Sequence, residues 1–342
     1  MTRALLVFAL AAAWAGVARA EPATVATLRM ATVAPEGSAW AHLLKAFGNE
    51  VESSSGGAVR VKWYFGAITG DELQTFEGIK QGHLDGIASG GVICERLAPS
   101  MRIQGLAGVF QSREEAAYVM ERIWPTIQEE TQRAGFEMLI VSGLGPEVIF
   151  SRTPVRSMND LRRMKVWRWA ADEVGIAVAG EMGLQVVPTD LDVAGRAYEA
   201  QRTDGFIAIP TAALAFQWSA QARYITDLRS GYLTGCVAIR NSAVDRLPPE
   251  HQRLLRSIMA KYDALFQEIG KRQDDALLGG LFQKQGLRPV PPSEAFHSEF
   301  FDSARAARER VAAKLVPRPL LDRVMRMLAD YRAEHPESAK AR

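Results

Sequence analysis

The feature that most constrains the fold of this chain is a five-part pattern that occurs twice, once in the first third and once in the middle. Each copy reads as strand, helix, strand, helix and strand, because alternating or β-branched runs are separated by stretches with helical periodicity. An Asp-Gly pair lies in the third strand of both copies, at residues 85–86 and 204–205. The expected elements span residues 28–34, 38–53, 59–65, 71–82 and 84–88 in the first copy, and 164–169, 172–182, 184–188, 192–202 and 203–208 in the second.

Two βαβαβ units predict an α/β protein with two lobes of like architecture. Parallel strands joined by helices form a sheet that is covered on both faces. Ligands of such sheets bind beyond the carboxyl ends of the strands, so two facing lobes would enclose a cleft that closes by hinge motion. One large doubly wound domain is the alternative, but two complete sets of elements favour two lobes.

The remaining segments are expected to connect and cover these units. A strand at 231–241 returns the chain to the first lobe, and a long helix starts at Pro248 and runs to about 285. Further helices are expected at 113–134, 293–315 and 320–331, and a further strand at 137–142. The predicted domains are a signal peptide at 1–20, lobe I at 21–143 and 231–262, lobe II at 144–230, and bridging and C-terminal helices at 263–342.

The first twenty residues have the pattern of a secretory signal peptide. Arg3 supplies a positive start, residues 4–17 are apolar, and Ala18 to Ala20 form a small-x-small cleavage site. A transmembrane anchor is the alternative, but this apolar stretch is too short to span a bilayer comfortably. We therefore expect a periplasmic protein whose signal peptide is cleaved.

Charge and hydropathy limit the partners of the mature chain. Cleavage after Ala20 removes Arg3 and Arg19, so the formal net charge falls from +2 to zero. A neutral protein is a poor partner for a polyanion, which argues against nucleic acid. Later segments lack about 20 uninterrupted apolar residues, so the chain is not expected to be embedded in a membrane.

The two cysteines, Cys94 and Cys236, both lie in apolar stretches. In an oxidising compartment they could pair. Two buried free thiols are the favoured interpretation, because unpaired cysteine is among the most buried residue types.

Signatures of catalysis and of cofactor binding are missing from the sequence. It contains no HExxH, CxxC, GxSxG or GxxxxGK[ST] motif, and its five histidines are scattered. Ser89-Gly90-Gly91 follows a strand without the spacing of a dinucleotide loop. We therefore predict no metal, no cofactor and no enzyme activity, with a binding protein as the favoured class. A secreted enzyme on the same fold remains an alternative.

Nine short segments, in order along nearly the whole mature chain, resemble the solute-binding subunits of tripartite ATP-independent periplasmic (TRAP) transporters of the DctP type. They are LRMATVAPEGS at 28–38, VRVKWY at 59–64, GHLDG at 82–86, FQSREE at 110–115, PVRSMNDL at 154–161, MKV at 164–166, TDG at 203–205, YITDL at 224–228 and LPPEH at 247–251. The resemblance implies a two-lobed periplasmic binding protein (type II-like) with a long bridging helix. It also implies delivery of a small-molecule ligand to the small and large permease subunits in the membrane.

The chain differs from this family at the expected ligand site. Many members carry an Arg after the Lys-hydrophobic pair, where it clamps a ligand carboxylate; here Trp167 stands there and Arg168 follows. Glu147 lies where a second Arg is expected, and apolar residues 207–210 replace a frequent Asn. The predicted ligand-binding residues, which are aromatic or polar and near strand ends, are Trp167, Arg168, Trp169, Glu147, Trp218, Gln217 and Phe65.

These residues predict an aromatic-lined cleft with a few polar anchors. The expected ligand is an organic acid or a partly apolar or aromatic molecule. A periplasmic sensor or adaptor that binds a receptor instead of a permease is the remaining alternative.

Overall fold

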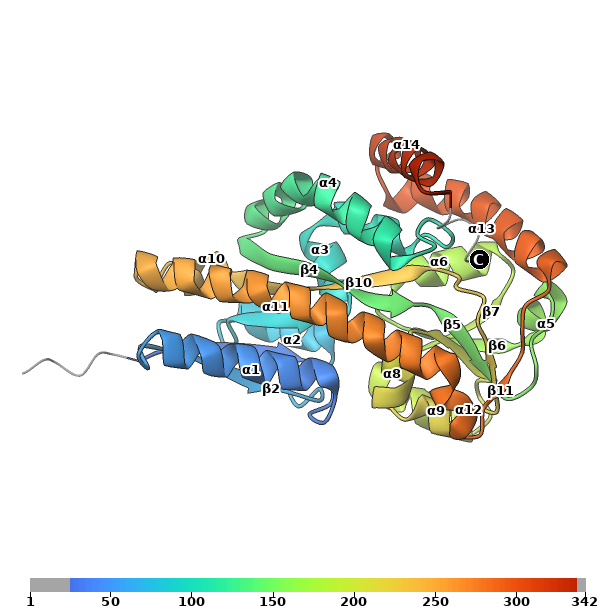
Figure 1. Ribbon diagram of the computed structural model, residues 1–342, viewed down its shortest axis with the longest axis horizontal. Coiled ribbons are helices and arrows are strands. Elements are labelled where there is room, and N and C mark those ends of the chain that lie inside the picture. The colour runs from blue at the N-terminus through green and yellow to red at the C-terminus, as the bar shows by residue number, and fades with distance from the viewer. Residues whose placement is uncertain (1–24, 337–342) are drawn as a thin grey trace, which may run out of the picture.

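The computed structural model describes residues 25–336, so the predicted signal peptide at 1–20 lies outside the described residues. Two separate sheets form the framework, a five-stranded sheet with the order β2-β1-β3-β10-β4 and a six-stranded sheet with the order β11-β9-β5-β8-β6-β7. Figure 1 shows the two lobes built on these sheets. The predicted α/β, two-lobed architecture is confirmed.

The first sheet contains the first predicted unit and two later strands. Strands β1, β2 and β3 are parallel, and β10 pairs antiparallel with both β3 and β4. Ser38 caps α1 by accepting a hydrogen bond from the Ala41 N–H, and Asp71 and Gln74 form a capping box on α2. The elements are β1 (Ala26–Thr32), α1 (Ala39–Ser54), β2 (Val59–Tyr64), α2 (Glu72–Lys80), β3 (Gly86–Ser89), α3 (Val92–Leu97), η1 (Pro99–Gly105), α4 (Arg113–Arg133), β4 (Phe136–Pro146) and β10 (Tyr232–Arg240).

The second sheet contains the second unit. Strands β6, β7 and β8 are parallel, and β5 pairs antiparallel with β8 and β9. The helix expected at 192–202 is shorter than predicted, since it begins with a 3₁₀ turn and ends at Glu199. Strands β5 and β9 were not predicted. The elements are β5 (Val148–Ser151), α5 (Met158–Arg163), β6 (Lys165–Trp169), α6 (Glu173–Glu181), β7 (Gln185–Thr189), η2 (Leu191–Val193), α7 (Ala194–Glu199), β8 (Gly205–Ala208), α8 (Pro210–Ala215), α9 (Trp218–Gln221), β9 (Tyr224–Thr226) and β11 (Arg288–Pro289).

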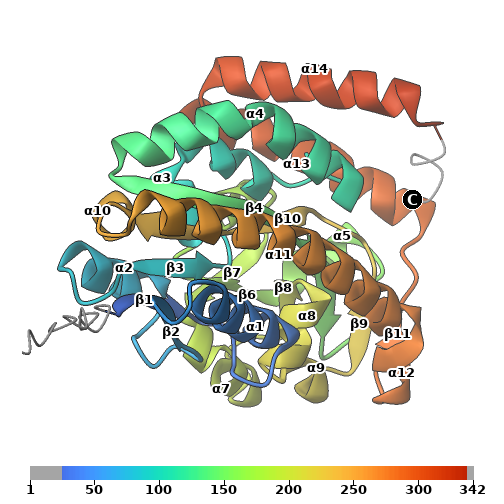
Figure 2. The same cartoon turned by 60° about the vertical axis from the view of Figure 1, so that its left-hand side comes forward.

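Helix α11 (Pro249–Ala276), which follows α10 (Asn241–Val244), joins the lobes. It packs on α1 and β4 of the first lobe and on α8 of the second, and Figures 1 and 2 show it crossing from one lobe to the other. The predicted helix to about 285 is interrupted, because a π-helical turn, Leu277–Leu281, follows α11. Gly280 in that turn has a φ of 134°, which favours glycine. A short helix, α12 (Phe282–Lys284), comes next.

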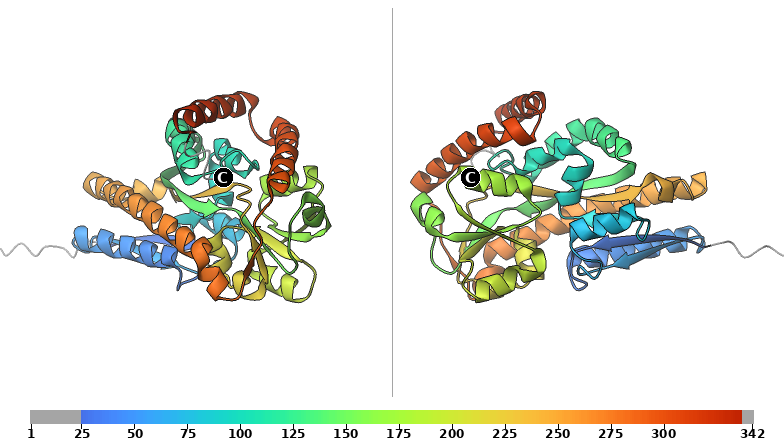
Figure 3. Two further views of the ribbon diagram at one scale, coloured as in Figure 1. Left: turned by 45° about the vertical axis from the view of Figure 1, so that its right-hand side comes forward. Right: turned by 180° about the vertical axis from the view of Figure 1, so that it is seen from behind.

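The two last helices return over the outside of the molecule. Helix α13 (Glu294–Leu315) packs on α5 and α6 of the second lobe, and α14 (Arg318–Glu334) packs on α4 of the first. Figure 3 shows helices α13 and α14 from two sides. Within residues 25–336, no helix combines the length and apolar character needed to cross a membrane. The domain boundaries given above stay a prediction.

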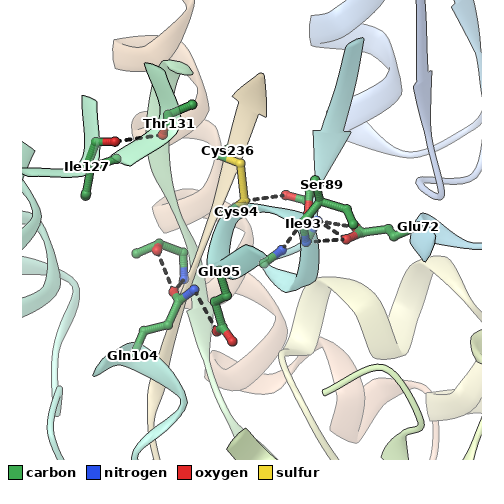
Figure 4. The surroundings of a disulfide bond; sticks show 12 residues. Glu72, Ser89, Ile93, Cys94, Glu95, Gln104, Ile127, Thr131 and Cys236 are labelled. Atoms are coloured by element: carbon green, nitrogen blue, oxygen red, sulfur yellow. Dashed lines mark hydrogen bonds between the residues drawn. A yellow bond between two sulfur atoms is a disulfide. The ribbon is translucent and has the colours of Figure 1, made fainter. Parts of the chain in front are cut away.

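Cys94 and Cys236 form a disulfide with a Cα–Cα distance of 5.9 Å, so the interpretation as free thiols is wrong (Figure 4). Strand β10 runs beside β3 and places Cys236 opposite Ser89, and α3 starts directly after β3. The two cysteines therefore meet although 142 residues separate them in sequence. That contact depends on the pairing of β10 with β3, which the local sequence around either cysteine does not encode.

Candidate ligand-binding pocket

A cavity of about 190 Å³ lies between the two lobes. The carboxyl ends of β1, β3, β6 and β8 reach it, as do residues of β4 and β10. This is the place where α/β sheets bind ligands, because loops and helix starts there leave room for a solute. Both copies of the repeated unit therefore contribute a wall.

Arg168 is the basic side chain among the described residues that line this cavity, and two carboxylates hold it. Its Nη1 donates to Oε1 of Glu147 at 2.7 Å, and its Nη2 donates to Oδ2 of Asp172 at 2.5 Å. Burial lowers the pKa of Arg168, but Glu147 and Asp172 raise it more, so the guanidinium stays charged. Burial raises the pKa of Glu147, and the charge of Arg168 opposes that rise.

Backbone contacts fix both partners of Arg168. The N–H of Glu147 donates to the carbonyl of Gly231 at 2.9 Å, and the N–H of Ser230 donates to the carbonyl of Glu147 at 3.0 Å. Asp172 also caps α6, since its Oδ1 accepts from the Gly175 N–H at 2.8 Å. A Cβ on Gly175 would overlap the side-chain ends of Arg168 and Asp172, so a larger residue there would force this ion pair to move.

An aromatic cluster forms the wall of the second lobe. The ring of Trp218 lies 4.8 Å from Trp167, 5.1 Å from Phe206 and 5.2 Å from Phe216, measured between centroids. Nε1 of Trp167 donates to Oγ1 of Thr189 at 2.8 Å. Trp167 and Trp218 are thus buried core residues that also present part of their surface to the cavity.

Glu95 and Gln104, which Figure 4 shows together, are two of the polar residues in the first-lobe wall. Nε2 of Gln104 donates to Oε1 of Glu95 at 3.3 Å, and Oε1 of Gln104 accepts from the Thr234 N–H at 2.7 Å. Burial, followed by the nearby charge of Asp172, raises the pKa of Glu95 to about 8. The disulfide at Cys94 anchors the helix that carries Glu95.

Five of the seven predicted residues line the cavity, and they are Trp167, Arg168, Trp169, Glu147 and Trp218. Arg168 lies in the lining together with its two Trp neighbours, because the cavity lies at the end of β6 and not on one face of its sheet. The other two residues lie elsewhere: Gln217 is exposed, and Phe65 is packed in the first-lobe core, stacked on Trp63 at 6.0 Å. Binding by the seven residues stays a prediction.

The sequence interpretation missed several lining residues, among them Glu95, Trp40 and Phe266. Glu95 carried a weak signal, because it is an acidic residue in an apolar helix that starts at the carboxyl end of a strand. Trp40 lies on α1 and Phe266 on the bridging helix α11, and neither showed such a signal. Among residues 25–336, no group of three His, Cys, Asp or Glu side chains is arranged to hold a metal ion.

Comparison with protein families gives one match that spans most of the chain. Residues 30–315 match the model of the DctP family, described as bacterial extracellular solute-binding protein, family 7. A curated protein of Albidiferax ferrireducens, described as a solute-binding protein, is 22% identical over 272 residues, which cover 77% of this chain and 78% of that protein.

Solved structures share the fold at low sequence identity. The galactonate complex of a sugar acid binding protein from Advenella mimigardefordensis has a TM-score of 0.83 and 15% identity, and covers 90% of this chain and 99% of its own. A Haemophilus influenzae TRAP periplasmic solute-binding protein with bound L-gulonate has a TM-score of 0.81 and 16% identity, with 89% and 99% covered. A Bordetella pertussis extracytoplasmic solute receptor binding pyroglutamic acid has a TM-score of 0.80 and 15% identity, with 89% and 99% covered.

Proposed function

This chain belongs to the bacterial extracellular solute-binding proteins, family 7, and from that premise we propose that it is the periplasmic receptor of a TRAP-type transporter. It captures a small organic molecule between its lobes and delivers it to the small and large permease subunits in the membrane. The observation that carries this proposal is the cavity, because side chains from both lobes line it. A solute held by both walls favours the closed arrangement of the lobes.

The proposal includes export by the signal peptide at 1–20 and a role without catalysis. A disulfide between buried cysteines is in keeping with an oxidising compartment such as the periplasm. Arg168 donates hydrogen bonds to both Glu147 and Asp172, which suits a rigid recognition site.

The lining supports a ligand with a partly apolar or aromatic body. Tryptophan and phenylalanine side chains from both lobes surround the cavity, and stacking and burial hold such molecules. The structural relatives named above bind galactonate, L-gulonate and pyroglutamic acid. An organic acid is the less favoured ligand here, since the guanidinium of Arg168 is already paired with two carboxylates of the chain.

Thermal unfolding in the presence of metabolite pools tests the receptor role. A solute present at 100 times its Kd should stabilise the folded protein by about 2.7 kcal/mol and raise Tm by several degrees. Mass spectrometry of the molecule that co-purifies from the periplasm would identify it. Substrate turnover with no stabilisation by any solute would contradict the proposal.

Uptake of the identified solute tests delivery. Vesicles containing the two permease subunits should accumulate it when this protein is present and not when it is left out. Uptake that is independent of the protein would contradict the role as a transporter subunit.

A further inference from the structure

The ionisable side chains that line the cavity, among residues 25–336, are unequal in sign. They comprise three carboxylates, Glu95, Glu147 and Asp172, and the guanidinium of Arg168. Negative charge exceeds positive by two when all four are ionised, and by one below about pH 8, where Glu95 holds its proton. A solute that enters this cavity therefore meets a wall that favours positive charge.

Arg168 is poorly placed to bind an anionic ligand. Its side chain is buried, and both terminal nitrogens already donate to Glu147 and Asp172. Each terminal nitrogen keeps one further N–H, but a ligand carboxylate bound there would be a third anion on the same guanidinium, repelled by the carboxylates of Glu147 and Asp172. The remaining nitrogen, Nε, is buried and has no acceptor among the described residues.

Glu95 has a neutral partner, not a cationic one. Its Oε1 accepts from the amide of Gln104 at 3.3 Å. The charged groups that act on it through space are Asp172 and Glu173, which repel its negative charge, and Arg102, which attracts it. A cation in the cavity would supply the opposite charge that this carboxylate lacks.

Aromatic side chains surround the same space. Trp40 comes from α1 of the first lobe, Phe266 from the bridging helix α11, and Trp169, Phe216 and Trp218 from the second lobe. The faces of these rings carry negative potential, and tryptophan attracts organic cations most strongly. Carboxylates among aromatic rings are the surroundings that ammonium groups require, whereas the apolar lining suits a metal ion poorly.

We propose that the ligand is an organic cation, an ammonium group on an apolar body. Its positive charge is recognised by the carboxylate of Glu95, together with those of Glu147 and Asp172 in the cluster around Arg168. The aromatic rings of both lobes enclose its body. This inference rests on the receptor function proposed above and names the class of solute that the receptor takes.

A matched set of probes tests the charge of the ligand. Phenylethyl, indolylethyl and cyclohexylethyl bodies are each prepared as the trimethylammonium compound, the neutral tert-butyl isostere and the carboxylate. Calorimetric titration should show the trimethylammonium member binding at least about tenfold more tightly than both others. Equal or tighter binding of a carboxylate or of a neutral isostere would overturn the inference. So would the absence of any ammonium probe with a Kd below about 1 mM.

A variant locates the charge in the cavity. Glu95→Gln keeps the size of the side chain and leaves the Arg168 pairs untouched. At about pH 9 it should weaken the trimethylammonium probe by about tenfold and leave the neutral isostere unchanged. The matched control is Glu77→Gln, which removes an exposed carboxylate of α2 outside the lining and should bind as the native protein does. Equal affinity in Glu95→Gln and native protein would overturn the inference.

A pH series gives an independent readout, because a trimethylammonium group does not titrate. Its affinity for the native protein should rise between about pH 6 and pH 9 as Glu95 loses its proton, and Glu95→Gln should remove most of this rise. An affinity that does not change with pH would count against Glu95 as the recognising group.

The receptor function and the charge of its ligand fail separately. If an anionic or neutral metabolite stabilises the protein and the ammonium probes do not bind, the receptor function stands and the inference is overturned. If no solute of any charge stabilises it and a substrate is turned over, the receptor function itself fails.

Discussion

The two lobes share a backbone framework down to single hydrogen bonds. Asp85 and Asp204 each accept from the backbone N–H of the first strand in their own unit, Arg29 at 2.9 Å and Lys165 at 3.0 Å. The glycine after each Asp has no room for a Cβ, because a carbonyl of the neighbouring antiparallel strand and a methionine lie against it. The repeat seen in sequence is therefore a repeat of contacts.

The side chains around these two aspartates differ. Asp85 is fully buried and accepts hydrogen bonds from the side chains of Arg29, Arg240 and Arg246. Burial raises its pKa, but these arginines and the backbone lower it more, to about 2. Asp204 is partly exposed. The difference shows that the framework was kept while each lobe acquired its own charges.

The same contrast holds at the cavity. The first lobe supplies Glu95 on a helix that a disulfide anchors, and the second supplies Arg168 between two carboxylates beside stacked aromatic rings. The two lobes thus present unlike chemistry to the cavity, and from different places in the repeated unit: Glu95 follows its third strand and Arg168 ends its first. A ligand touching both lobes would be recognised by two different surfaces.

The largest expected effect comes from the aspartates. Asp85→Asn should reduce the free energy of unfolding by about 3–5 kcal/mol, because a neutral amide replaces a fully buried carboxylate that accepts charge-assisted hydrogen bonds from three partly exposed arginines. Asp204→Asn should cost about 1 kcal/mol or less, since its amide oxygen can still accept from Lys165. Urea unfolding of both variants gives the comparison. Equal losses would show that the two sites are energetically alike after all.

The second-largest expected effect comes from the disulfide, which lies in the first lobe. Replacing Cys94 and Cys236 together by Ala should lower the free energy of unfolding by about 2–5 kcal/mol, because the bond closes a long loop. Reduction of the native protein should give a similar loss. Ammonium-probe affinity should fall as well, as α3 carries Glu95. Unchanged stability in both experiments would contradict a structural role for the bond.

Two glycines of α6 test how tightly the Arg168 cluster is packed. Gly175→Ala should destabilise the protein by about 2 kcal/mol, because the new methyl group overlaps Arg168 and Asp172. Gly180→Ala is the control on the same helix. It has no neighbour within 4 Å and should stabilise by about 0.5–1 kcal/mol. A Gly175→Ala protein as stable as the native one would mean that the cluster is loose.

The smallest expected effect is the pH dependence of stability that Glu95, in the first-lobe wall of the cavity, produces. The folded-state pKa of Glu95, about 8, lies above its ordinary value of 4.5, so ionisation favours unfolding. Without ligand, the stability of the native protein should therefore fall relative to Glu95→Gln as pH rises from about 4.5 to 8, and the difference should level off above that range. We expect about 1–2 kcal/mol, less than full burial would give, because the side chain is partly exposed. A difference that stays constant with pH would contradict a buried, protonated Glu95.

Much of the framework could be predicted because its signals are local. The cap Ser38, the alternating run of β-formers at 59–64 and the Asp-Gly pairs each report on a few neighbouring residues. Strands β5 and β9 were missed since both are short, and a run of three or four buried residues shows no period. The kink at Gly280 was missed as well, although Gly279 precedes it and a Gly-Gly pair is a local signal for a break in a helix.

The candidate site could be predicted in part. Strand ends are readable, so Trp167, Arg168 and Trp218 were placed near the cavity before the fold was known. Gln217 and Phe65 lie outside the lining, because the direction of a side chain near a strand end depends on what packs against it. Glu95 reaches the cavity through the docking of α3, which is a tertiary contact.

By itself, the sequence determined two βαβαβ units, a long helix that follows them and aromatic residues at the strand ends, because periodicity and capping depend on residues close together in the chain. Only the tertiary structure decided three pairings: Cys94 with Cys236, Arg168 with Glu147, and Glu95 with Gln104. Cys236 comes from the distant strand β10, and Glu147 from the link between β4 and β5. Gln104 reaches Glu95 because the 3₁₀ turn η1 folds back on α3. The chemistry of the cavity follows from those pairings. Arg168 alone suggests an anionic solute, but its guanidinium is already paired with carboxylates of the chain. Glu95 has no cationic partner, so the two residues together favour a cationic solute.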